Sequence, residues 1–360
     1  MITVIIGTKG QFLKIVPILI ELEKRGYDYN FINARQHANS LDKMIKLFNI
    51  KKPDAIMWNY SKDITTVREI FNWLIINSMK YSFGSKNKIF QKKKNKNILL
   101  VHGDAPPVLL GLFLGKFHNI DLAHIEAGCR THNIRAPFPE EIIRIIADRF
   151  CNLLFPLSVF ASVNVLDKYK SKMVFPMKRN TVYDVVKIAL NKPQKLFAKS
   201  FVLTSIHRFE TITSQKKMKF IVDLLTKNIK NEKIIFPVHE STKRALIKYN
   251  LYNDLENNSN ILVTSLMDYF TYISHIKNAK YLITDGGGPQ EESFYLGTPS
   301  LILRGNAERI WDNNCLAGFN INKINNFLNN PENYRTNPIR DDYSSSKLIV
   351  DILEKLGYIS

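Results

Sequence analysis

Short apolar runs alternate with helix-spaced apolar positions along the first half of the chain. A run such as Ile98-Leu99-Leu100-Val101 is too short for a buried helix and is typical of a strand buried on both faces. Between such runs, apolar residues recur every three or four positions, which predicts amphipathic helices. The predicted strands are Thr3–Ile6, Tyr29–Asn33, Ile98–Val101 and Leu122–Ile125. The predicted helices are Leu13–Lys24, Ser40–Phe48, Ile64–Ser78 and Pro139–Phe150.

The same alternation restarts in the second half of the chain. The strands predicted there are Phe201–Ser205, Lys233–Val238, Ile261–Val263, Tyr281–Thr284 and Ser300–Leu303. The helices predicted there are Ser214–Asn228, Met267–Lys277 and Gln290–Leu296. Strands that alternate with helices favour parallel sheets built from βαβ units. We therefore predict an α/β protein with two doubly wound Rossmann-like domains facing a central cleft.

The chain length of 360 residues suits two domains of ordinary size. The mixed-charge stretch 168–178, with Pro176, is the predicted hinge. We place an N-terminal domain at 1–172, a C-terminal domain at 173–344 and a terminal helix within 345–360. The pattern leaves open which of the two domains the helix Ser345–Lys355 packs against.

Composition narrows the class of protein. The chain is 45% hydrophobic and 23% charged, which is typical of soluble globular proteins, and no apolar run approaches the ~20 residues of a membrane span. The first residues lack a basic n-region, so we interpret them as a strand and not as a signal peptide. Cys129, Cys151 and Cys315 lack the spacing of metal ligands. Together these features predict reduced thiols in a cytoplasmic protein.

The formal net charge of +19 leaves several partners open. Basic proteins bind nucleic acids or anionic membranes, but no zinc-finger, RRM or KH pattern is present, and we predict no nucleic-acid partner. An anionic small-molecule substrate, or a peripheral association with lipid phosphates, explains the charge at least as well. A plain compositional bias toward lysine also fits, with the densest run, Lys86–Lys96, in an exposed loop.

Carboxylates follow two of the predicted strands and a proline-containing loop. Asp104 comes after the strand 98–101, Glu126 after the strand 122–125, and Glu140 and Glu141 open the next helix. Ligands of open α/β sheets bind at the carboxyl ends of strands, so these acids are candidates for acid/base chemistry. Two structural alternatives remain: Asp104 caps the next helix, or Glu140 and Glu141 only stabilise a helix dipole.

A triple glycine follows the predicted strand 281–284. Gly286, Gly287 and Gly288 would let backbone N–H groups approach an anion at the start of the next helix. A plain tight turn explains the three glycines as well. The acids that follow, Glu291 and Glu292, either stabilise the helix dipole or bind ribose hydroxyls.

Two histidines also follow predicted strands of the second half. His207 lies after the strand 201–205 and His239 after the strand 233–238. A structural role is the alternative for each, although two histidines at equivalent strand ends favour a site. The guanidinium of Arg208 suits a phosphate, which it can bind with two hydrogen bonds.

The order and spacing of these motifs resemble the UDP-N-acetylglucosamine 2-epimerase family, which has a two-domain fold like the GT-B glycosyltransferases. The resemblance covers most of the chain, from Ile5 to Arg309. The segments that carry it are Gly7-Thr8 with Lys14, Gln36-His37, Val101–Asp104, His124–Thr131, Pro137–Arg144, Asn180–Asp184, His207–Glu210, Pro237–His239, Thr284-Asp285, Gly287-Gly288, Gln290–Glu292 and Glu308-Arg309.

The resemblance implies roles for the matching positions. Asp104, Glu126 and Glu140 resemble the acid/base carboxylates of the family, with Glu141 left as helix support, and His207 resembles its catalytic or diphosphate-side histidine. The implied nucleotide-binding positions are Lys9, Lys14, Arg208, His239, Gly286, Gly287, Gly288, Glu292 and Arg309. Gln36 and His37 resemble part of an allosteric UDP-sugar site in the non-hydrolysing branch of the family.

The chemistry that the resemblance implies is inversion at C2 of a UDP-N-acetylhexosamine. A carboxylate removes the C2 proton, UDP leaves C1, and UDP returns after the proton is delivered to the other face. The implied partner is a UDP-sugar for surface glycan precursors, and neither a metal nor another cofactor is expected. A homodimer is left open.

Three departures from the family pattern lie on the expected nucleotide side. Lys9 replaces an arginine, Gly286 replaces a serine, and Ile310 replaces a proline. Alternatives to the epimerase therefore remain: a glycosyltransferase on the same frame, a hydrolysing epimerase that releases UDP and free N-acetylmannosamine, or a regulatory protein that only binds a sugar nucleotide.

Overall fold

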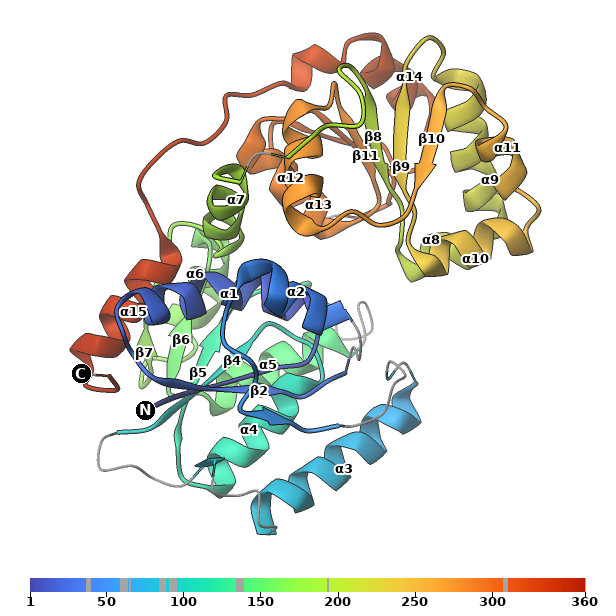
Figure 1. Ribbon diagram of the computed structural model, residues 1–360. Helices are drawn as coiled ribbons and strands as arrows, with labels where there is room; N and C mark the ends of the chain where they lie inside the picture. Colours follow the sequence, from blue (N-terminus) through green and yellow to red (C-terminus); the bar gives the residue numbers. More distant parts are fainter. Residues whose placement is uncertain are drawn as a thin grey trace. The chain divides into compact units, whose positions relative to one another are not determined.

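The structure is a computed structural model, and it forms two compact units. Unit 1 comprises Met1–Val185 and Tyr343–Ser360, and unit 2 comprises Val186–Asp342. Figure 1 shows a sheet with covering helices in each unit. The residues described are those of the chain other than 37–39, 59–63, 65, 84–88, 91–95, 134–138, 193, 307–309 and 360.

Unit 1 is built on a seven-stranded sheet, within its described residues, of order β3-β2-β1-β4-β5-β6-β7. Its strands, which pair in parallel, are β1 Ile2–Ile6, β2 Tyr29–Asn33, β3 Ala55–Ile56, β4 Ile98–His102, β5 Asp121–Ile125, β6 Leu153–Phe155 and β7 Met173–Val174. Its helices are α1 Lys9–Lys24, α2 Ser40–Phe48, α3 Val67–Phe83, α4 Pro107–Phe117, α5 Glu140–Phe150, α6 Val159–Leu166 and α15 Ser345–Lys355. Helices α1 and α15 lie on one face of the sheet and α3 and α4 on the other (Figure 1).

Unit 2 has a six-stranded parallel sheet, counted over the residues described, of order β10-β9-β8-β11-β12-β13. Its strands are β8 Val202–Ser205, β9 Ile234–Pro237, β10 Ile261–Thr264, β11 Leu282–Thr284, β12 Ser300–Ile302 and β13 Asn314–Leu316. Its helices are α8 Phe209–Ile212, α9 Gln215–Asp223 with a π-helical continuation Leu224–Asn228, α10 Glu240–Lys248, α11 Tyr252–Glu256, α12 Tyr269–Asn278, α13 Gly287–Leu296, α14 Ile321–Asn329 and the 3₁₀ turn Pro331–Tyr334. Helix α7, Val182–Leu190, contains the boundary between the units. The predicted α/β class with two parallel sheets is confirmed.

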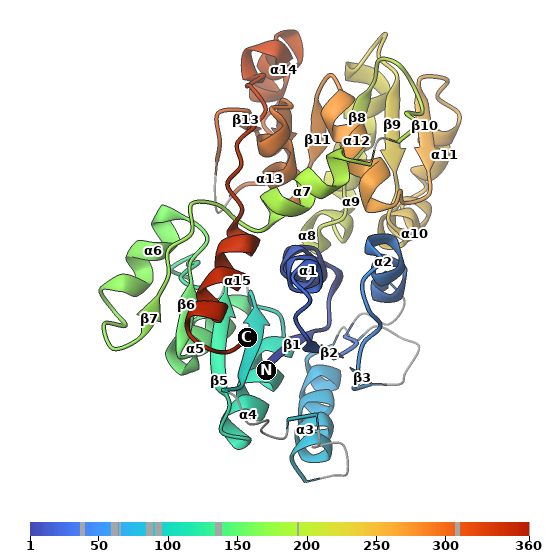
Figure 2. The same ribbon diagram turned by 60° about the vertical axis from the view of Figure 1, so that its left-hand side comes forward.

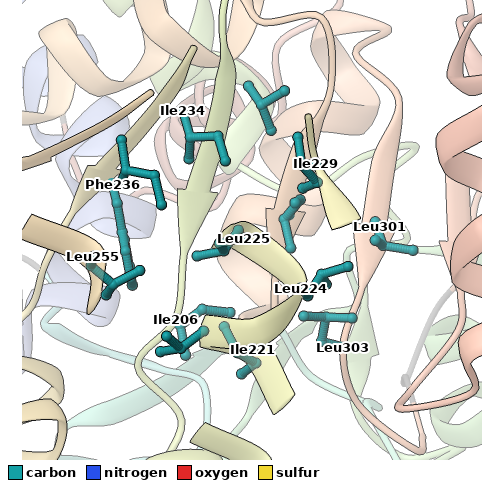
Figure 3. Packing of buried hydrophobic residues seen from close by; sticks show 14 of the residues in the cluster. Ile206, Ile221, Leu224, Leu225, Ile229, Ile234, Phe236, Leu255, Leu301 and Leu303 are labelled. Atoms are coloured by element: carbon teal, nitrogen blue, oxygen red, sulfur yellow. The ribbon is translucent and has the colours of Figure 1, made fainter. Parts of the chain in front are cut away.

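The core of unit 2 explains why its strands are short and apolar. Ile221, Leu224 and Leu225 of α9 and its π-helical continuation are almost fully buried, in the same cluster as Phe236 of β9 and Leu301 of β12 (Figure 3). A parallel strand covered by helices on both faces favours apolar residues on both, which is why these strands are mostly apolar in the sequence.

The C-terminal helix belongs to unit 1, which settles the alternative that the sequence left open. Helix α15 packs on α1, and Arg25 pairs with Asp351 at 2.6 Å and with Glu354 at 3.2 Å. The amino group of Met1 donates to the carbonyl of Tyr358 at 2.8 Å, so the two ends of the chain meet in this unit, as Figure 2 shows.

Candidate active site

The acids of unit 1 lie at one edge of its sheet because β4 and β5 are parallel neighbours. His102 of β4 pairs in register with Ile125 of β5, so the residues that follow each strand emerge side by side. Glu126 has the left-handed φ of +72°, which is uncommon outside glycine. Two residues on, a Cβ on Gly128 would lie 2.1 Å from the carbonyl oxygen of Ala161, so only glycine fits this close approach.

Glu126 is the centre of a charged cluster. Nζ of Lys14, on the second turn of α1, donates to both of its carboxylate oxygens at 2.7 and 2.8 Å. Nδ2 of Asn180 donates to Oε1 at 3.0 Å. The side chain of Glu126 is 15% exposed and that of Lys14 is 27% exposed, so the pair is partly desolvated yet open to a ligand. The lysine stabilises the carboxylate form of Glu126, which is the form that accepts a proton.

His102 lies beneath this cluster as a neutral group. Its Nε2 is 3.8 Å from Oε2 of Glu126. Burial lowers the pKa of His102 to about 3, against the opposing attraction of the Glu126 charge. The positive charge beside Glu126 therefore comes from Lys14 and not from this histidine.

Asp104 forms an ion pair and does not cap the next helix. Its Oδ2 lies 2.5 Å from Nη2 of Arg144 on α5, whereas the N-cap of α4 is Pro106, with no side-chain hydrogen bond. The same arginine lies 3.5 Å from Glu141. Glu141 also accepts from the backbone N–H of Thr131 at 3.0 Å, so it supports the loop that follows β5 as well as the helix.

Glu140 is the first residue of α5, and Pro139, predicted as the first residue of this helix, is its N-cap. Its Oε2 is buried and has no hydrogen-bond partner among the described residues. Stabilisation of the helix dipole requires no such burial, so the dipole alone does not account for the position of this oxygen.

A second buried network, which the sequence did not reveal, ties the acid-bearing loops together. Nδ1 of His124 on β5 contacts Oδ1 of Asp148 on α5 at 2.6 Å, and its Nε2 contacts the carbonyl of Gly103 at 2.9 Å. The other oxygen of Asp148 accepts from Gly128 N–H at 3.0 Å and from Arg130 at 2.6 Å. Burial opposes ionisation of Asp148, but the charges of His124 and Arg130 outweigh it and lower the pKa of Asp148.

In unit 2, the two predicted histidines come together at the carboxyl ends of β8 and β9. The rings of His207 and His239 stack, with centroids 4.7 Å apart and planes at 28°. The buried carboxylate of Asp285, after β11, accepts from the backbone N–H groups of His207 and Arg208, both at 3.0 Å. The guanidinium of Arg208 pairs with Glu210 at 2.6 Å, so binding a phosphate there would require it to exchange partners.

The glycine segment after β11 differs from the predicted turn. Helix α13 begins at Gly287, with Gly286 as its N-cap in an extended conformation, so Gly287 and Gly288 belong to its first turn. The predicted start at Gln290 was three residues late, because glycines are poor helix formers in sequence-based reasoning. The early start brings the first backbone N–H groups of α13 to this edge of the sheet, where a helix N-terminus favours an anion.

Arg304 adds a cation at the same place. It follows β12, its Nη2 donates to Oε1 of Gln290 on α13 at 2.6 Å, and its Nη1 lies 3.8 Å from where a Cβ on Gly287 would be. The sequence signal was present, since Arg304 lies just past the end of an apolar strand, but it was overlooked.

The glutamates of α13 do not stabilise the start of the helix. Glu291 and Glu292 are buried and lie beyond the first turn, so the helix-dipole alternative is wrong for both. Glu291 accepts from the hydroxyl of Tyr295 at 3.0 Å. Burial, followed by the charge of Glu292, raises the pKa of Tyr269 well above its usual value, which places that acid next to the tyrosine.

The other predicted positions are more scattered. Lys9 is the first residue of α1, after the N-cap Thr8, and is partly exposed. Gln36 follows β2, and its carbonyl accepts from Ile64 N–H at 3.0 Å. His37 and Arg309 lie outside the described residues. Among the described residues, no group of three His, Cys, Asp or Glu could hold a metal ion, and no helix has the length and apolarity needed to cross a bilayer.

A comparison with known families agrees with this geometry. The sequence model of the UDP-N-acetylglucosamine 2-epimerase family matches residues 20–354. The chain belongs to this family. A 2-epimerase homologue from Methanococcus maripaludis is 29% identical and is aligned over 99% of each chain. The UDP-N-acetylglucosamine 2-epimerase of Methanocaldococcus jannaschii is also 29% identical, over 97% of each chain.

The solved structures show the same fold. A crystal structure of the Methanocaldococcus jannaschii UDP-GlcNAc 2-epimerase in complex with UDP-GlcNAc and UDP matches with a TM-score of 0.82 and 28% identity, over 98% of this chain and 99% of that one. The predicted family, the predicted enzyme class and the predicted fold are confirmed by these matches.

Proposed function

We propose that this enzyme inverts C2 of a UDP-N-acetylhexosamine in the cytoplasm, converting UDP-GlcNAc to UDP-ManNAc for surface glycan synthesis. The observation that carries the proposal is the Glu126 carboxylate held by Lys14 and Asn180 at the end of β5. The Methanocaldococcus jannaschii relative, crystallised with UDP-GlcNAc and UDP, supports the substrate class.

The reaction is an elimination followed by an addition. A carboxylate takes the proton from C2, the C–H electron pair becomes the C1=C2 double bond, and the C1–O pair leaves with UDP. The intermediate is a 2-acetamidoglucal. Inversion then requires that a proton reach C2 from the opposite face while an oxygen of UDP attacks C1, so at least two acid/base groups are needed.

Glu126 and Glu140 supply the two kinds of group that this sequence needs. The Lys14 charge keeps Glu126 in the carboxylate form, which is the form that can act as a base. Glu140, with a buried oxygen that has no partner among the described residues, can deliver one. Asp104 is held by Arg144. In the proposal it passes protons to and from Glu126 and Glu140.

Charge developing on UDP is stabilised in unit 2. The first N–H groups of α13 and the guanidinium of Arg304 are donors suited to a diphosphate. Such donors, fixed before the reaction, lower the barrier to departure of an anion.

Proton NMR of the protein with UDP-GlcNAc in heavy water tests this proposal. We expect loss of the C2 proton signal through exchange with deuterium, together with manno-configured UDP-sugar. Free N-acetylmannosamine with UDP would instead indicate the hydrolysing mode. Absence of C2 exchange would overturn the proposal, and turnover only with an added acceptor would indicate a glycosyltransferase.

Two variants extend this experiment, one that tests the proposed base and one that serves as its control. Glu126→Gln should lower the rate of C2 exchange by about 10²–10⁴-fold, because the amide cannot accept the proton. Glu256→Gln makes the same replacement of a carboxylate by an amide at an exposed position on α11. It should leave the exchange rate unchanged. An undiminished exchange rate in Glu126→Gln would assign the base to another residue.

We also propose that two copies pair through the apolar face of α3 and α4. Seven apolar side chains on this face are between 43 and 76% exposed: Phe71, Ile75, Ile76, Met79, Phe83, Phe113 and Phe117. The rings of Phe83 and Phe117 are 5.0 Å apart, so the two helices form one surface. It presents on the order of 700 Å², close to the roughly 800 Å² that each partner contributes to a standard interface.

Light scattering coupled to gel filtration tests this pairing. We expect a mass of twice the 41.7 kDa of one chain, and a monomer for the double variant Phe71→Ser with Phe83→Ser. Phe160→Ser, at the 83% exposed phenylalanine of α6, is the matched control and should remain dimeric. A monomeric wild-type protein would contradict the pairing.

A further inference from the structure

Gly286 is the only place near the start of α13 where a side chain would collide with a histidine, among the residues described. A Cβ there would lie 2.5 Å from Cε1 and 3.2 Å from Nε2 of His207, and 3.1 Å from Cδ of Pro289. A contact of 2.5 Å forces movement. At Gly287 the nearest described atom would be 3.8 Å away, on Arg304, and at Gly288 none lies within 4 Å.

The His207 ring, which a side chain at 286 would displace, is also held by Asp285 and His239. Asp285 fixes the backbone N–H of His207 at 3.0 Å and lies 3.8 Å from its Nδ1. His239 stacks on the ring, with centroids 4.7 Å apart. The missing side chain of Gly286 leaves the space that the imidazole edge fills. The ring therefore lies over the N-terminus of α13, where the anion is expected.

We propose that Gly286 is a positioning residue for His207, which places the imidazole where it donates a hydrogen bond to the diphosphate of the substrate. The inference rests on the proposed function for the identity of the anion. A serine at 286 could itself donate a hydroxyl hydrogen bond to the diphosphate. Because residue 286 is glycine, the imidazole of His207 is the donor there instead.

A second consequence of Gly286 supports the same role. Serine, threonine, aspartate and asparagine at an N-cap accept hydrogen bonds from the first N–H groups of their own helix. Gly286 has no side chain to do so, and those N–H groups of α13 remain available to a ligand. A side chain with an acceptor atom at 286 would compete for these helix amides, whereas alanine has no acceptor and would displace only the ring.

The first test measures the position of the ring without any ligand. In proton–nitrogen NMR tuned to imidazole, assigned by loss of the signal in His207→Asn, Gly286→Ala should shift the His207 resonances. The matched control is Gly305→Ala, because no described atom lies within 4 Å of a Cβ at this glycine of the same sheet edge. An unmoved His207 signal in Gly286→Ala would overturn the proposal.

The second test is a double-mutant cycle on UDP affinity, measured by titration calorimetry. Loss of a hydrogen bond to a charged group weakens binding roughly tenfold or more, so we expect this loss for Gly286→Ala and less than about twofold for Gly305→Ala. In a His207→Asn background, Gly286→Ala should cause almost no further loss, because the ring it displaces is gone. Equal loss in both backgrounds would assign the effect to the backbone and contradict the proposal.

The two failures can be told apart. A wild-type protein that neither binds UDP nor exchanges the C2 proton would refute the proposed function, while the NMR shift of His207 would still report its positioning. A protein that binds UDP equally well with Gly286→Ala would refute the positioning role alone. Thermal unfolding of each variant identifies any that fails to fold.

Discussion

The carboxyl edge of the unit 1 sheet holds its carboxylates with cations, whereas the same edge of unit 2 holds its carboxylate with backbone amides. Glu126 and Asp104 are 15 and 29% exposed and pair with Lys14 and Arg144. Asp285 is fully buried, with its oxygens occupied by two backbone N–H groups. Two sheets of the same topology thus differ in what they present to a ligand, proton-transfer groups in one and donors for an anion in the other.

The comparison teaches that the strands fix the place of each site and the residues after them fix the chemistry. If it is correct, changes in unit 1 should alter the rate with little effect on UDP affinity. Changes in unit 2 should alter UDP affinity first. Glu126→Gln and Arg304→Gln test this separation, while Asp148→Asn and Thr8→Ala test how each sheet edge is held in place.

Glu126→Gln should have the largest effect. Loss of a positioned acid/base group lowers rates by about 10²–10⁴-fold, and we expect this loss in kcat, measured by NMR of C2 exchange. UDP affinity should stay within about threefold, because the donors proposed for UDP lie in unit 2. A large loss of UDP affinity would break the separation of roles.

Asp148→Asn should destabilise unit 1 strongly. Removing one partner of a buried ion pair costs about 3–5 kcal/mol, which urea unfolding at pH 7 would detect. Because the folded pKa of Asp148 is lowered, its contribution is present above the unfolded pKa of about 3.9 and is lost as the pH falls through the folded value. The variant should therefore lose less stability than the wild type over that acidic range.

The control for Asp148 is a partly exposed aspartate of unit 2. Asp223 pairs with Lys227 at 2.6 Å and with Lys219 at 3.2 Å, and its side chain is 34% exposed. Asp223→Asn should cost less than about 1 kcal/mol, as is usual for surface ion pairs. An equal loss of unfolding free energy in Asp148→Asn and Asp223→Asn would contradict the view that burial makes the Asp148 ion pair important.

Arg304→Gln should weaken UDP binding about tenfold or more, since a charged hydrogen bond to phosphate is lost. The elimination rate at saturating substrate should fall less than in Glu126→Gln. Arg335→Gln, at an exposed arginine paired with Glu332, is the control and should bind UDP normally. Calorimetric titration with UDP measures both, and an unchanged affinity in Arg304→Gln would remove it from the diphosphate site.

Thr8→Ala should have the smallest effect. The hydroxyl of Thr8 caps α1 by accepting from Gln11 N–H at 3.2 Å, and loss of such a cap costs about 1 kcal/mol. Thr8→Ser keeps the oxygen that caps the helix, so it should lower the free energy of unfolding by only about a few tenths of a kcal/mol. Helix α1 is capped by a side chain, whereas α13 has Gly286 at its N-cap and no side-chain cap. An unchanged unfolding free energy in Thr8→Ala would mean that this difference between the two helices does not affect stability.

The buried strands were the easiest elements to predict, because a run such as 98–101 has no polar position. Helix α4 was missed for the opposite reason. It is apolar around most of its circumference and contains Gly111 and Gly115, so no amphipathic period appears. Its glycines are explained only by tertiary contact, since a Cβ on Gly111 would lie 2.5 Å from Val101.

The candidate site was predictable where one residue follows one strand, as for Asp104, Glu126 and His239. Its partners were not. Lys14 and Glu126 are 112 positions apart, and their pairing depends on how α1 crosses the sheet edge. Asp148 lacked a local signal that distinguishes it from an ordinary surface charge, because its role comes from burial and from neighbours distant in the sequence. Arg304 follows an apolar strand, but its contact with Gln290 on α13 could not be predicted from that position alone.

The last segment of the chain belongs to unit 1, and this affects how the protein is synthesised. Unit 2 is one continuous segment, Val186–Asp342, whereas unit 1 needs Tyr343–Ser360 to place α15 on α1 and to meet Met1. At a translation rate of ~5–20 residues per second, the first part of unit 1 therefore waits on the order of ten to thirty seconds on the ribosome for its last helix. During that interval the acid-bearing half of the enzyme lacks the cover that α15 gives to α1, although it is made first.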